Sequence, residues 1–243
     1  MNILITGASR GIGYYTALSL ASIVTNHVFA VSRDEAGLDR LMEEYKQVSV
    51  KGKLTICIGD FQNEEFLKAL SQKIEKEVSV LNILINNAGY LKYLPFEKLT
   101  GSDWKEIYEA NVFGPVNLIR SMLNLLMKSD SNSSGGIKNH IVNISSIGGV
   151  QGSVKFKGLS AYSSSKGALC VLTECLAEEF KEENIAVNCL ALGSVQTEMF
   201  TQAFPGFSAS QQPLEMGNYI ARFAMEGSKF YNGKVLEVSV STP

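Results

Sequence analysis

The amino-acid sequence predicts an α/β fold, in which a single domain holds a doubly wound, parallel, seven-stranded sheet with helices on both faces. Two observations predict it. Short apolar runs alternate along the chain with longer segments that carry apolar residues at helical spacing. The run at 80–85 is almost wholly apolar, as is typical of a parallel strand buried on both faces. Because no repeat and no long linker interrupts the alternation, we expect residues 1–243 to form one domain.

Strands and helices alternate strictly along the first part of the chain. Strands are predicted at short apolar runs, and helices at longer stretches in which one face is apolar. In the third helix, for example, Leu67, Leu70 and Ile74 share a face. In chain order we predict strand 2–6, helix 12–23, strand 27–31, helix 35–47, strand 54–58, helix 64–77 and strand 80–85.

The second part of the chain continues the pattern with longer helices. A kink is expected in the first of them, because Pro115 has no N–H to bond to the carbonyl of Asn111. The polar stretch 129–138 is too short to be a domain linker. In chain order we predict helix 102–127, strand 141–144, helix 161–182, strand 185–191, helix 217–227 and strand 235–240.

Composition excludes several classes of protein. The 22 Lys and Arg residues nearly balance the 24 Asp and Glu residues and form no basic stripe, so neither a nucleic acid nor a membrane surface is expected as a partner. The apolar runs are far shorter than the roughly 20 residues that span a bilayer, and the start of the chain lacks a basic region and a cleavage site. We therefore expect a cytoplasmic protein.

Cysteine usage predicts a reduced protein without a metal site. Cys57, Cys170, Cys175 and Cys189 each stand in an apolar stretch, where we expect them to behave as small hydrophobic residues. No two of them form a Cys-x-x-Cys pair, and the 2 His residues stand at no spacing usual for zinc.

The first strand runs into a glycine turn that opens a helix, Thr6-Gly7-Ala8-Ser9-Arg10-Gly11-Ile12-Gly13. Glycines there let backbone N–H groups approach a pyrophosphate, and the helix N-terminus adds favourable partial charge. The turn closes the first βαβ unit, where a Rossmann-type dinucleotide site requires it. A tight βα turn without a ligand is the alternative interpretation.

The end of the second strand bears on the choice of dinucleotide. An acidic residue at this place binds the ribose of NAD, whereas arginine accommodates the 2′-phosphate of NADP. Ser32 stands at the position expected to be acidic and Arg33 follows it, while Arg10 can approach the same phosphate. Asp34 has two interpretations, a ribose ligand or a helix N-cap. We expect NADP(H), with NAD(H) as the second choice.

Tyr162 and Lys166 lie four residues apart, on one face of a predicted helix. A nearby ammonium can bring the pKa of a tyrosine, ordinarily about 10, into a range useful for acid–base catalysis. An isolated Tyr-x-x-x-Lys is weak evidence, because a solvated pair is its ordinary explanation. The strand before it ends at Ser145 and Ser146, which places hydroxyl groups at the edge of the sheet where ligands bind.

Together these motifs resemble the short-chain dehydrogenase/reductase family. The glycine turn, the segment Asn86-Asn87-Ala88-Gly89, Asn111, Ser146 and the Tyr162/Lys166 pair follow one another in the order of that family. The resemblance extends from the first strand to about Val238. It implies a Rossmann-type fold and hydride transfer between a nicotinamide and a carbonyl or secondary alcohol.

The resemblance also implies roles for single residues. Tyr162 would be the general acid or base, Lys166 would bind the nicotinamide ribose and lower the tyrosine pKa, and Ser146 would orient the carbonyl, with Ser145 as the fallback. Asn111, through its freed carbonyl and a water, would complete a proton relay to Lys166. The implied cofactor-binding residues are Gly7, Ser9, Arg10, Gly11, Ile12, Gly13, Ser32, Arg33, Asp60, Phe61, Asn87, Ala88, Gly89, Tyr162, Lys166, Gly193, Val195 and Thr197.

Several features depart from the family pattern. Leu192 stands where the family usually has proline, and the chain ends without the usual Asp-Gly-Gly, which leaves a tetramer contact open. We expect two loops to shape the substrate pocket. Loop 147–161 carries Lys155 and Lys157, either ligands for an anionic substrate or solvated, and loop 197–213 is rich in Phe and resembles a mobile apolar lid.

Apolar residues cover nearly all sides of the segment 110–127, more than one sheet can bury. We therefore expect a homodimer through this helix and helix 161–182, or, alternatively, burial under a loop. The expected function is an NADP(H)-dependent reductase of a small-molecule carbonyl compound, tilted towards apolar substrates. The alternatives are a catalytically silent NADP(H)-binding regulatory protein and a structural subunit of a complex.

Overall fold

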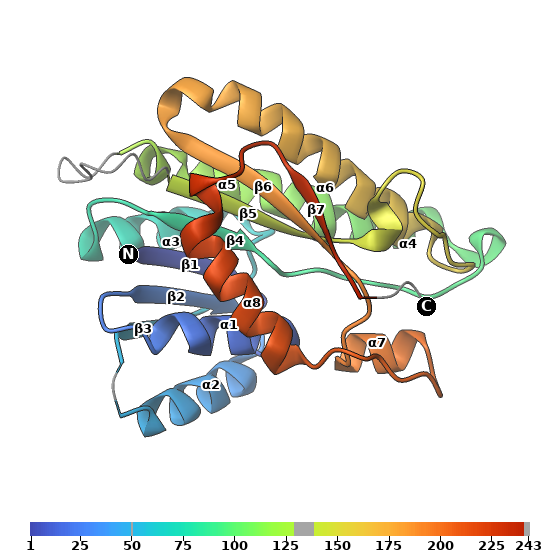
Figure 1. Ribbon diagram of the computed structural model, residues 1–243, viewed down its shortest axis with the longest axis horizontal. Helices are drawn as coiled ribbons and strands as arrows, with labels where there is room; N and C mark the ends of the chain where they lie inside the picture. Colours follow the sequence, from blue (N-terminus) through green and yellow to red (C-terminus); the bar gives the residue numbers. More distant parts are fainter. Residues whose placement is uncertain (50, 129–138, 241–243) are drawn as a thin grey trace.

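Seven parallel strands form one sheet in the order β3-β2-β1-β4-β5-β6-β7 (Figure 1). The computed structural model describes residues 1–49, 51–128 and 139–240, so the polar stretch 129–138 lies outside the described residues. The predicted fold class is confirmed. The strands are β1 (Asn2–Thr6), β2 (His27–Ser32), β3 (Lys53–Ile58), β4 (Ile83–Asn86), β5 (Asn139–Ser146), β6 (Ile185–Leu192) and β7 (Val235–Val238).

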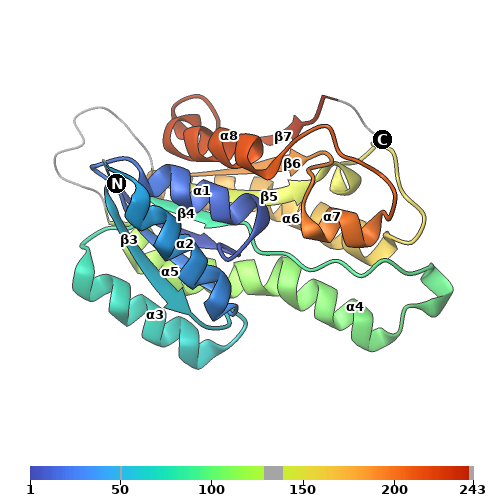
Figure 2. The ribbon, with the colours of Figure 1, turned by 90° about the horizontal axis from the view of Figure 1, so that it is seen from below.

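Helices cover both faces of this sheet, in two layers that each bury an apolar cluster (Figures 1 and 2). On one face pack α1 (Gly11–Ala21), α2 (Glu35–Gln47) and α8 (Pro213–Glu226). On the other pack α3 (Glu64–Glu77), α5 (Gly114–Leu126) and α6 (Ser160–Glu179). The other α-helices of the described residues are α4 (Gly101–Tyr108) and α7 (Glu198–Ala203). Among the described residues, no helix combines the length and the apolar character needed to cross a bilayer.

Two helices have the predicted bounds, and a side chain just before each of them caps its first turn. Asp34 accepts a hydrogen bond from the Gly37 N–H at the start of α2, and Asn63 accepts one from the Phe66 N–H at the start of α3. Of the two interpretations of Asp34, its hydrogen bond with Gly37 agrees with the helix N-cap. Elsewhere the boundaries moved: α8 begins at Pro213 rather than at 217, and β5 runs from Asn139 to Ser146.

The long helix predicted at 102–127 is divided. A π-helical turn at Glu109–Phe113 (η2) separates α4 from α5, and the Gly114 N–H bonds to the Glu109 carbonyl five residues back. Pro115 follows directly and has no N–H to continue the α-helical ladder. The chain thus accommodates the proline by widening one turn.

Three of the four cysteines are buried as predicted, but Cys175 is exposed. The prediction was wrong for Cys175 because it lies on the outer side of α6, near the exposed Val171 and Glu178, whereas Cys170 and Ala177 face the sheet. Apolar neighbours in the sequence did not reveal which side of the helix it occupies. Among the described residues, no group of His, Cys, Asp and Glu is arranged to hold a metal ion.

A buried histidine makes the stability of this fold sensitive to pH. His140 on β5 donates through Nδ1 to the Ala224 carbonyl at 2.9 Å and accepts through Nε2 from the Asn188 amide at 3.0 Å. This arrangement uses the neutral imidazole, and burial lowers the pKa of His140 from 6.5 to about 4.

The unfolded chain therefore gains a proton below pH 6.5 that the folded chain does not take up. We expect the free energy of unfolding to fall as the pH decreases from about 6.5 to about 4, by up to about 3 kcal/mol. Urea unfolding between pH 5 and 7 measures this slope above the range in which most carboxylates titrate. The His140→Gln variant should show a flatter slope, and equal slopes in the two proteins would contradict the assignment to His140.

Candidate active site

A cleft of about 830 Å³ lies at the carboxyl edge of the sheet, beyond the ends of β1, β2, β4, β5 and β6. Ligands in open parallel sheets bind at this edge, where successive connections leave on opposite faces. Residues far apart in the sequence meet there, including the glycine turn after β1 and Tyr162 on α6. The cleft is large enough for a dinucleotide fragment together with a small substrate.

The glycine turn has the close packing of a backbone cradle. Gly7 has a φ of +70°, a backbone angle that residues with a side chain rarely adopt. A Cβ on Gly13 would lie 2.3 Å from the Gly7 carbonyl oxygen and 2.3 Å from Asn87 Nδ2. The Asn87 amide in turn donates to the Thr6 carbonyl at 2.9 Å. Asn87 therefore braces the turn from the end of β4.

The first N–H groups of α1 are not capped by a side chain. Arg10 occupies the N-cap position with extended backbone and makes no side-chain cap hydrogen bond, and the first turn holds no acidic residue. An uncapped helix N-terminus of this kind stabilises an anion that lies before it. The cradle and the uncapped N-terminus together fit the pyrophosphate of a dinucleotide.

Each arginine beside this cradle is paired with a carboxylate. Arg10 Nη1 lies 2.9 Å from Glu198 Oε2 at the start of α7, and Arg33 Nη1 lies 3.4 Å from Asp60 Oδ2. Both pairs are largely exposed, so each contributes little to stability and either arginine can exchange its partner for a phosphate at small cost. Glu198 was not predicted from the sequence, because 188 residues separate it from Arg10.

Tyr162, Ser146 and Lys166 line the other end of the cleft. The Lys166 ammonium lies 5.9 Å from the centre of the Tyr162 ring and donates to the Ile144 carbonyl at 2.8 Å. Burial lowers the pKa of Lys166 from 10.5 to about 8. Ser146 also accepts a hydrogen bond from the Gly148 N–H at 3.2 Å, which orients its hydroxyl group.

The pKa of Tyr162 differs from the expectation that Lys166 lowers it. Burial raises the pKa of Tyr162 from 10 to about 12, against the smaller lowering effect of its hydrogen bond with Ser146. The prediction of a lowered pKa was wrong, because burial of the phenolate raises the pKa more than the hydrogen bond with Ser146 lowers it. Tyr162 thus retains its proton at neutral pH.

Asn111 is fully buried and does not line the cleft. Its side chain holds the segment after β4: Oδ1 accepts from the Tyr90 N–H at 2.7 Å, and Nδ2 donates to the Tyr90 carbonyl and to Ser165 Oγ, each at 2.9 Å. A Cβ on Gly89 would lie within 3.3 Å of both Asn111 Oδ1 and Lys166 Nζ. Asn111 therefore adjoins the lysine, and its part in a proton relay stays a prediction.

Ser145, the fallback for Ser146, has its hydroxyl group committed elsewhere. It donates to the Lys166 carbonyl at 2.9 Å and accepts from Cys170 Sγ at 3.3 Å. These contacts tie β5 to α6 and thereby position Lys166. Ser146, not Ser145, is the serine that is hydrogen-bonded to the Tyr162 hydroxyl group.

The segment after β6 forms the third side of the cleft. Gly193, Val195 and Thr197 all line it, and Thr197 also caps α7 by accepting from the Phe200 N–H at 3.1 Å. Val195 pairs with Gln211 in an isolated bridge. The two ends of the loop that begins at Thr197 therefore lie next to each other, at the bridge between Val195 and Gln211.

Nearly all predicted site residues gather at this cleft; the two outside its lining are Asn111 and Asp60. Asp60 accepts from the Gln62 N–H and pairs with Arg33, while its neighbours Phe61 and Gln62 line the cleft. Residues that were not predicted as site members include Tyr90, Tyr93 and Glu198. The sequence carries no motif for them, because their positions depend on how loops pack.

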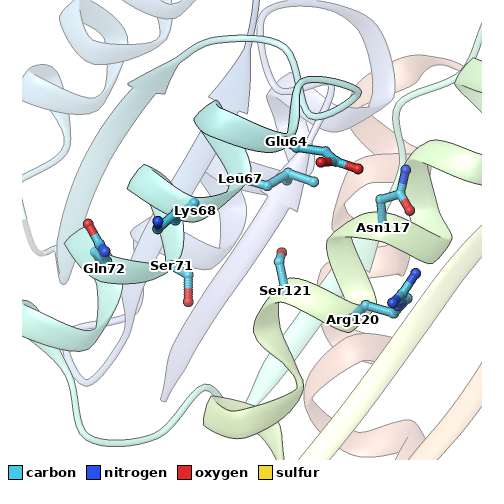
Figure 3. A pocket seen from close by; sticks show the side chains of 8 residues that line it. All are labelled: Glu64, Leu67, Lys68, Ser71, Gln72, Asn117, Arg120 and Ser121. Atoms are coloured by element: carbon cyan, nitrogen blue, oxygen red, sulfur yellow. The ribbon is translucent and has the colours of Figure 1, made fainter.

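A second, more open hollow of about 440 Å³ lies between α3 and α5 (Figure 3). Polar side chains, among them Glu64, Lys68 and Arg120, surround it, and no predicted site residue lines it. The glycine turn, Tyr162 and Lys166 all line the first cleft, which is the candidate active site.

The family model described as short chain dehydrogenase matches residues 1–206. The chain belongs to the short-chain dehydrogenase family. Its fold is that of the family's oxidoreductases, which act on CH–OH and C=O groups. The resemblance seen in the sequence is thereby confirmed.

Relatives of this short-chain dehydrogenase span several activities. It is 30% identical over 197 residues to glucose 1-dehydrogenase 2 of Bacillus subtilis (strain 168), across 80% of this chain and 72% of that protein. It is 31% identical over 199 residues to nodulation protein G of Rhizobium sp. (strain N33), across 81% and 74%. Among solved structures, the NADP complex of Pseudomonas aeruginosa RhlG superimposes with a TM-score of 0.83 at 26% identity, covering 98% of this chain and 94% of RhlG.

Proposed function

We propose that this short-chain dehydrogenase is an NADP(H)-dependent oxidoreductase that interconverts a carbonyl compound and a secondary alcohol, with Tyr162 as the general acid or base. The observation that carries the proposal is the position of Tyr162, Ser146 and Lys166 in the same cleft as the uncapped N-terminus of α1. A dinucleotide held at that N-terminus can reach a substrate held at the hydroxyl groups of Tyr162 and Ser146.

The residues present fit a nicotinamide dinucleotide. The turn Gly7–Gly13 and the N-terminus of α1 would hold the pyrophosphate, and Asn87 to Gly89, Lys166, Val195 and Thr197 would line its path towards Tyr162. When bound, the nicotinamide supplies the hydride to the carbonyl carbon, or accepts it from the alcohol.

The side chains of the chain itself would handle the proton. In reduction, the Tyr162 hydroxyl donates its proton to the carbonyl oxygen as that oxygen gains negative charge. Ser146 donates a hydrogen bond to the same oxygen and orients it. The Lys166 ammonium stabilises the tyrosinate that remains. Because its own pKa is lowered, Lys166 can also supply the proton that restores the Tyr162 hydroxyl. Oxidation of an alcohol uses the same groups in reverse.

The preference for NADP(H) rests on two arginines and the absence of an acidic residue at position 32. Arg10 and Arg33 both line the cleft near Ser32, whose Oγ donates to Ser9 Oγ at 2.9 Å. A 2′-phosphate bound there would replace Glu198 as the partner of Arg10 and Asp60 as the partner of Arg33. RhlG, similar in fold, was solved with NADP.

Replacing Arg33 with Asp should invert this preference. We expect the ratio of kcat/KM with NADPH to that with NADH to fall by at least about tenfold, because a charge-assisted hydrogen bond is lost and a like charge faces the phosphate. Initial rates of NADPH and NADH oxidation over a panel of aldehydes and ketones measure the ratio. Arg222→Asp, an equal change of charge on α8 outside the cleft, is the control. An unchanged ratio in Arg33→Asp would overturn the proposed role of Arg33.

Assembly and location complete the proposal. Phe113 beside α5 and Val171 on α6 are 49% and 59% exposed, which leaves apolar surface on the two helices predicted to form a homodimer. The homodimer and the cytoplasmic location stay predictions, as does the division of substrate contacts between loops 147–161 and 197–213.

A further inference from the structure

Four aromatic rings from three separate parts of the chain form one side of the cleft. These rings, here named the aromatic wall, are Tyr93, Phe156, Phe200 and Phe204, and all four line the same cavity as Tyr162 and Ser146. Tyr93 follows β4, Phe156 precedes α6, and Phe200 and Phe204 belong to α7 and its C-terminus. Figure 2 shows α7 beside the segment that joins β4 to α4.

Phe204 is the centre of the aromatic wall. Its ring centroid lies 5.2 Å from that of Phe200, 5.9 Å from that of Tyr93 and 6.1 Å from that of Phe156. The pairs with Tyr93 and Phe156 are edge-to-face, with interplanar angles of 63° and 73°. Pairs of this geometry are more favourable than their buried area alone accounts for. Phe204 thus joins loop 197–213 to the two segments opposite.

The segments opposite Phe204 are themselves held in place. Leu94 N–H donates to the Gly158 carbonyl at 3.0 Å, which ties the Tyr93 segment to the Phe156 segment. Gly158 has a φ of +87°, and a Cβ there would lie 3.0 Å from the Tyr93 ring. The Tyr93 ring therefore packs closely over Gly158, so backbone contacts as well as side chains define its position.

Hydrogen bonds of Gln196 also hold the base of loop 197–213 together. The Gln196 side chain accepts from the Ala209 N–H at 2.7 Å and donates to Thr201 Oγ1 at 3.0 Å, and Gln196 N–H donates to the Gln211 carbonyl. These bonds span the loop from within.

No charged side chain of the cleft lining belongs to the aromatic wall. The charged lining residues are Arg10, Arg33, Asp34, Lys166 and Glu198. Glu198 begins α7, the helix that carries Phe200, and is paired with Arg10; the other four lie in the cofactor turn, after β2 or on α6.

Three lysines neighbour the wall in sequence, Lys92, Lys155 and Lys157, and none of them lines the cleft. Lys155 donates to the Val150 carbonyl at 2.6 Å, and Lys92 pairs with Asp103. Of the two interpretations of Lys155, a ligand for an anionic substrate has no support from its contacts. Because none of these lysines lines the cleft, a carboxylate held against the aromatic wall would have no lining cation beside it, and burying an unpaired charge is costly.

We infer that the substrate is an uncharged carbonyl compound whose carbonyl group is attached to an aromatic ring, and that Phe204 is the residue that selects it. The inference rests on the proposed function for the position of the reacting carbonyl. The ring stacks against Phe204 and the other members of the aromatic wall, while the carbonyl oxygen meets Tyr162 and Ser146. A ring of the substrate thereby takes part in the contacts that hold loop 197–213 against Tyr93 and Phe156.

Three probes of equal core size test this inference. Acetophenone has the ring and no charge, 4-acetylbenzoate adds a carboxylate at the far end of the ring, and cyclohexyl methyl ketone replaces the ring with a saturated one. Binding is measured on the full chain by saturation-transfer NMR titration, and turnover by NADPH oxidation. We expect acetophenone to bind about two- to tenfold more tightly than the cyclohexyl ketone, and 4-acetylbenzoate to bind at least about tenfold more weakly than acetophenone.

Two variants test which residues cause the preference for the aromatic ketone. Phe204→Leu retains an apolar side chain without a ring, and Tyr93→Leu does the same from a segment outside loop 197–213. Each should reduce the preference for acetophenone over the cyclohexyl ketone to about one, because the edge-to-face contacts are lost. Phe230→Leu, a ring that is 77% exposed and outside the cleft, is the matched control and should leave the preference unchanged. Thermal unfolding of each variant verifies that it is folded.

The outcomes separate this inference from the proposed function. Selective binding of acetophenone without turnover would support the aromatic site and overturn the proposed reductase activity. Turnover with equal use of the charged or the saturated probe would leave the reductase standing and overturn the aromatic specificity. No detectable binding of acetophenone, or an unchanged preference in Phe204→Leu, would also overturn it.

Discussion

Removing the phenolic hydroxyl of Tyr162 should abolish most of the activity while leaving the cofactor bound. For Tyr162→Phe we expect kcat to fall by about 10²- to 10⁴-fold, the range that a positioned general acid contributes. The physical reason is that Tyr162 retains its proton, with a pKa raised by burial to about 12, and is hydrogen-bonded to Ser146 in the cleft. Phenylalanine fills the same space and donates no proton.

The measurement is NADPH oxidation with a carbonyl substrate, together with a titration of NADPH fluorescence. Tyr108→Phe is the control, because Tyr108 stacks on Trp104 in α4 and does not line the cleft. A Tyr162→Phe variant that keeps more than a tenth of kcat would contradict the role of Tyr162. If both proteins bind NADPH and the wild type reduces no carbonyl compound, the regulatory alternative is favoured instead.

Adding a single methyl group at Gly13 should disrupt the cofactor turn. The new Cβ would lie 2.3 Å from the carbonyl oxygen of Gly7, which is backbone and cannot swing aside, and 2.3 Å from the amide nitrogen of Asn87. We expect Gly13→Ala to lose about 1–3 kcal/mol in the free energy of unfolding through overpacking. We also expect NADPH affinity to fall by at least about tenfold, because the turn and the first N–H groups of α1 would move apart.

Gly101→Ala provides a matched control on α4. A Cβ there meets nothing within 4 Å, so the same substitution should leave stability unchanged or raise it by up to about 1 kcal/mol. Thermal unfolding and NADPH titration of both variants check the pair. Normal NADPH affinity in a destabilised Gly13→Ala protein would show that the turn is structural and that the dinucleotide binds elsewhere.

The sequence predicted those parts of the fold whose causes are local. Helices α2 and α3 begin at the predicted residues because Asp34 and Asn63 cap their first turns. The parallel sheet followed from buried strands such as β4, in which every residue is buried. An interruption of the helix 102–127 near Pro115 was predicted, but its form as a π-helical turn was not, because a proline can be accommodated by a kink or by a widened turn and packing decides between them.

The candidate site divides in the same way. Residue spacing alone placed Tyr162 and Lys166 on one helical face, and the ends of β1, β4 and β5 brought Gly7, Asn87 and Ser146 to one edge of the sheet. The sequence did not predict that Asn111 would be committed to the Tyr90 backbone, or that Glu198 would pair with Arg10. Side-chain partners separated by tens to hundreds of residues depend on how loops pack.

The sequence by itself determined the α/β order, the glycine turn and the residues that carry the proposed chemistry, because each depends on periodicity or on neighbours within a few positions. Only the tertiary structure decided how those groups titrate and what surrounds them. The pKa of Tyr162 is raised rather than lowered because desolvation depends on everything packed around the phenol. The aromatic wall exists only where three distant segments converge on Phe204, and no local pattern encodes that convergence.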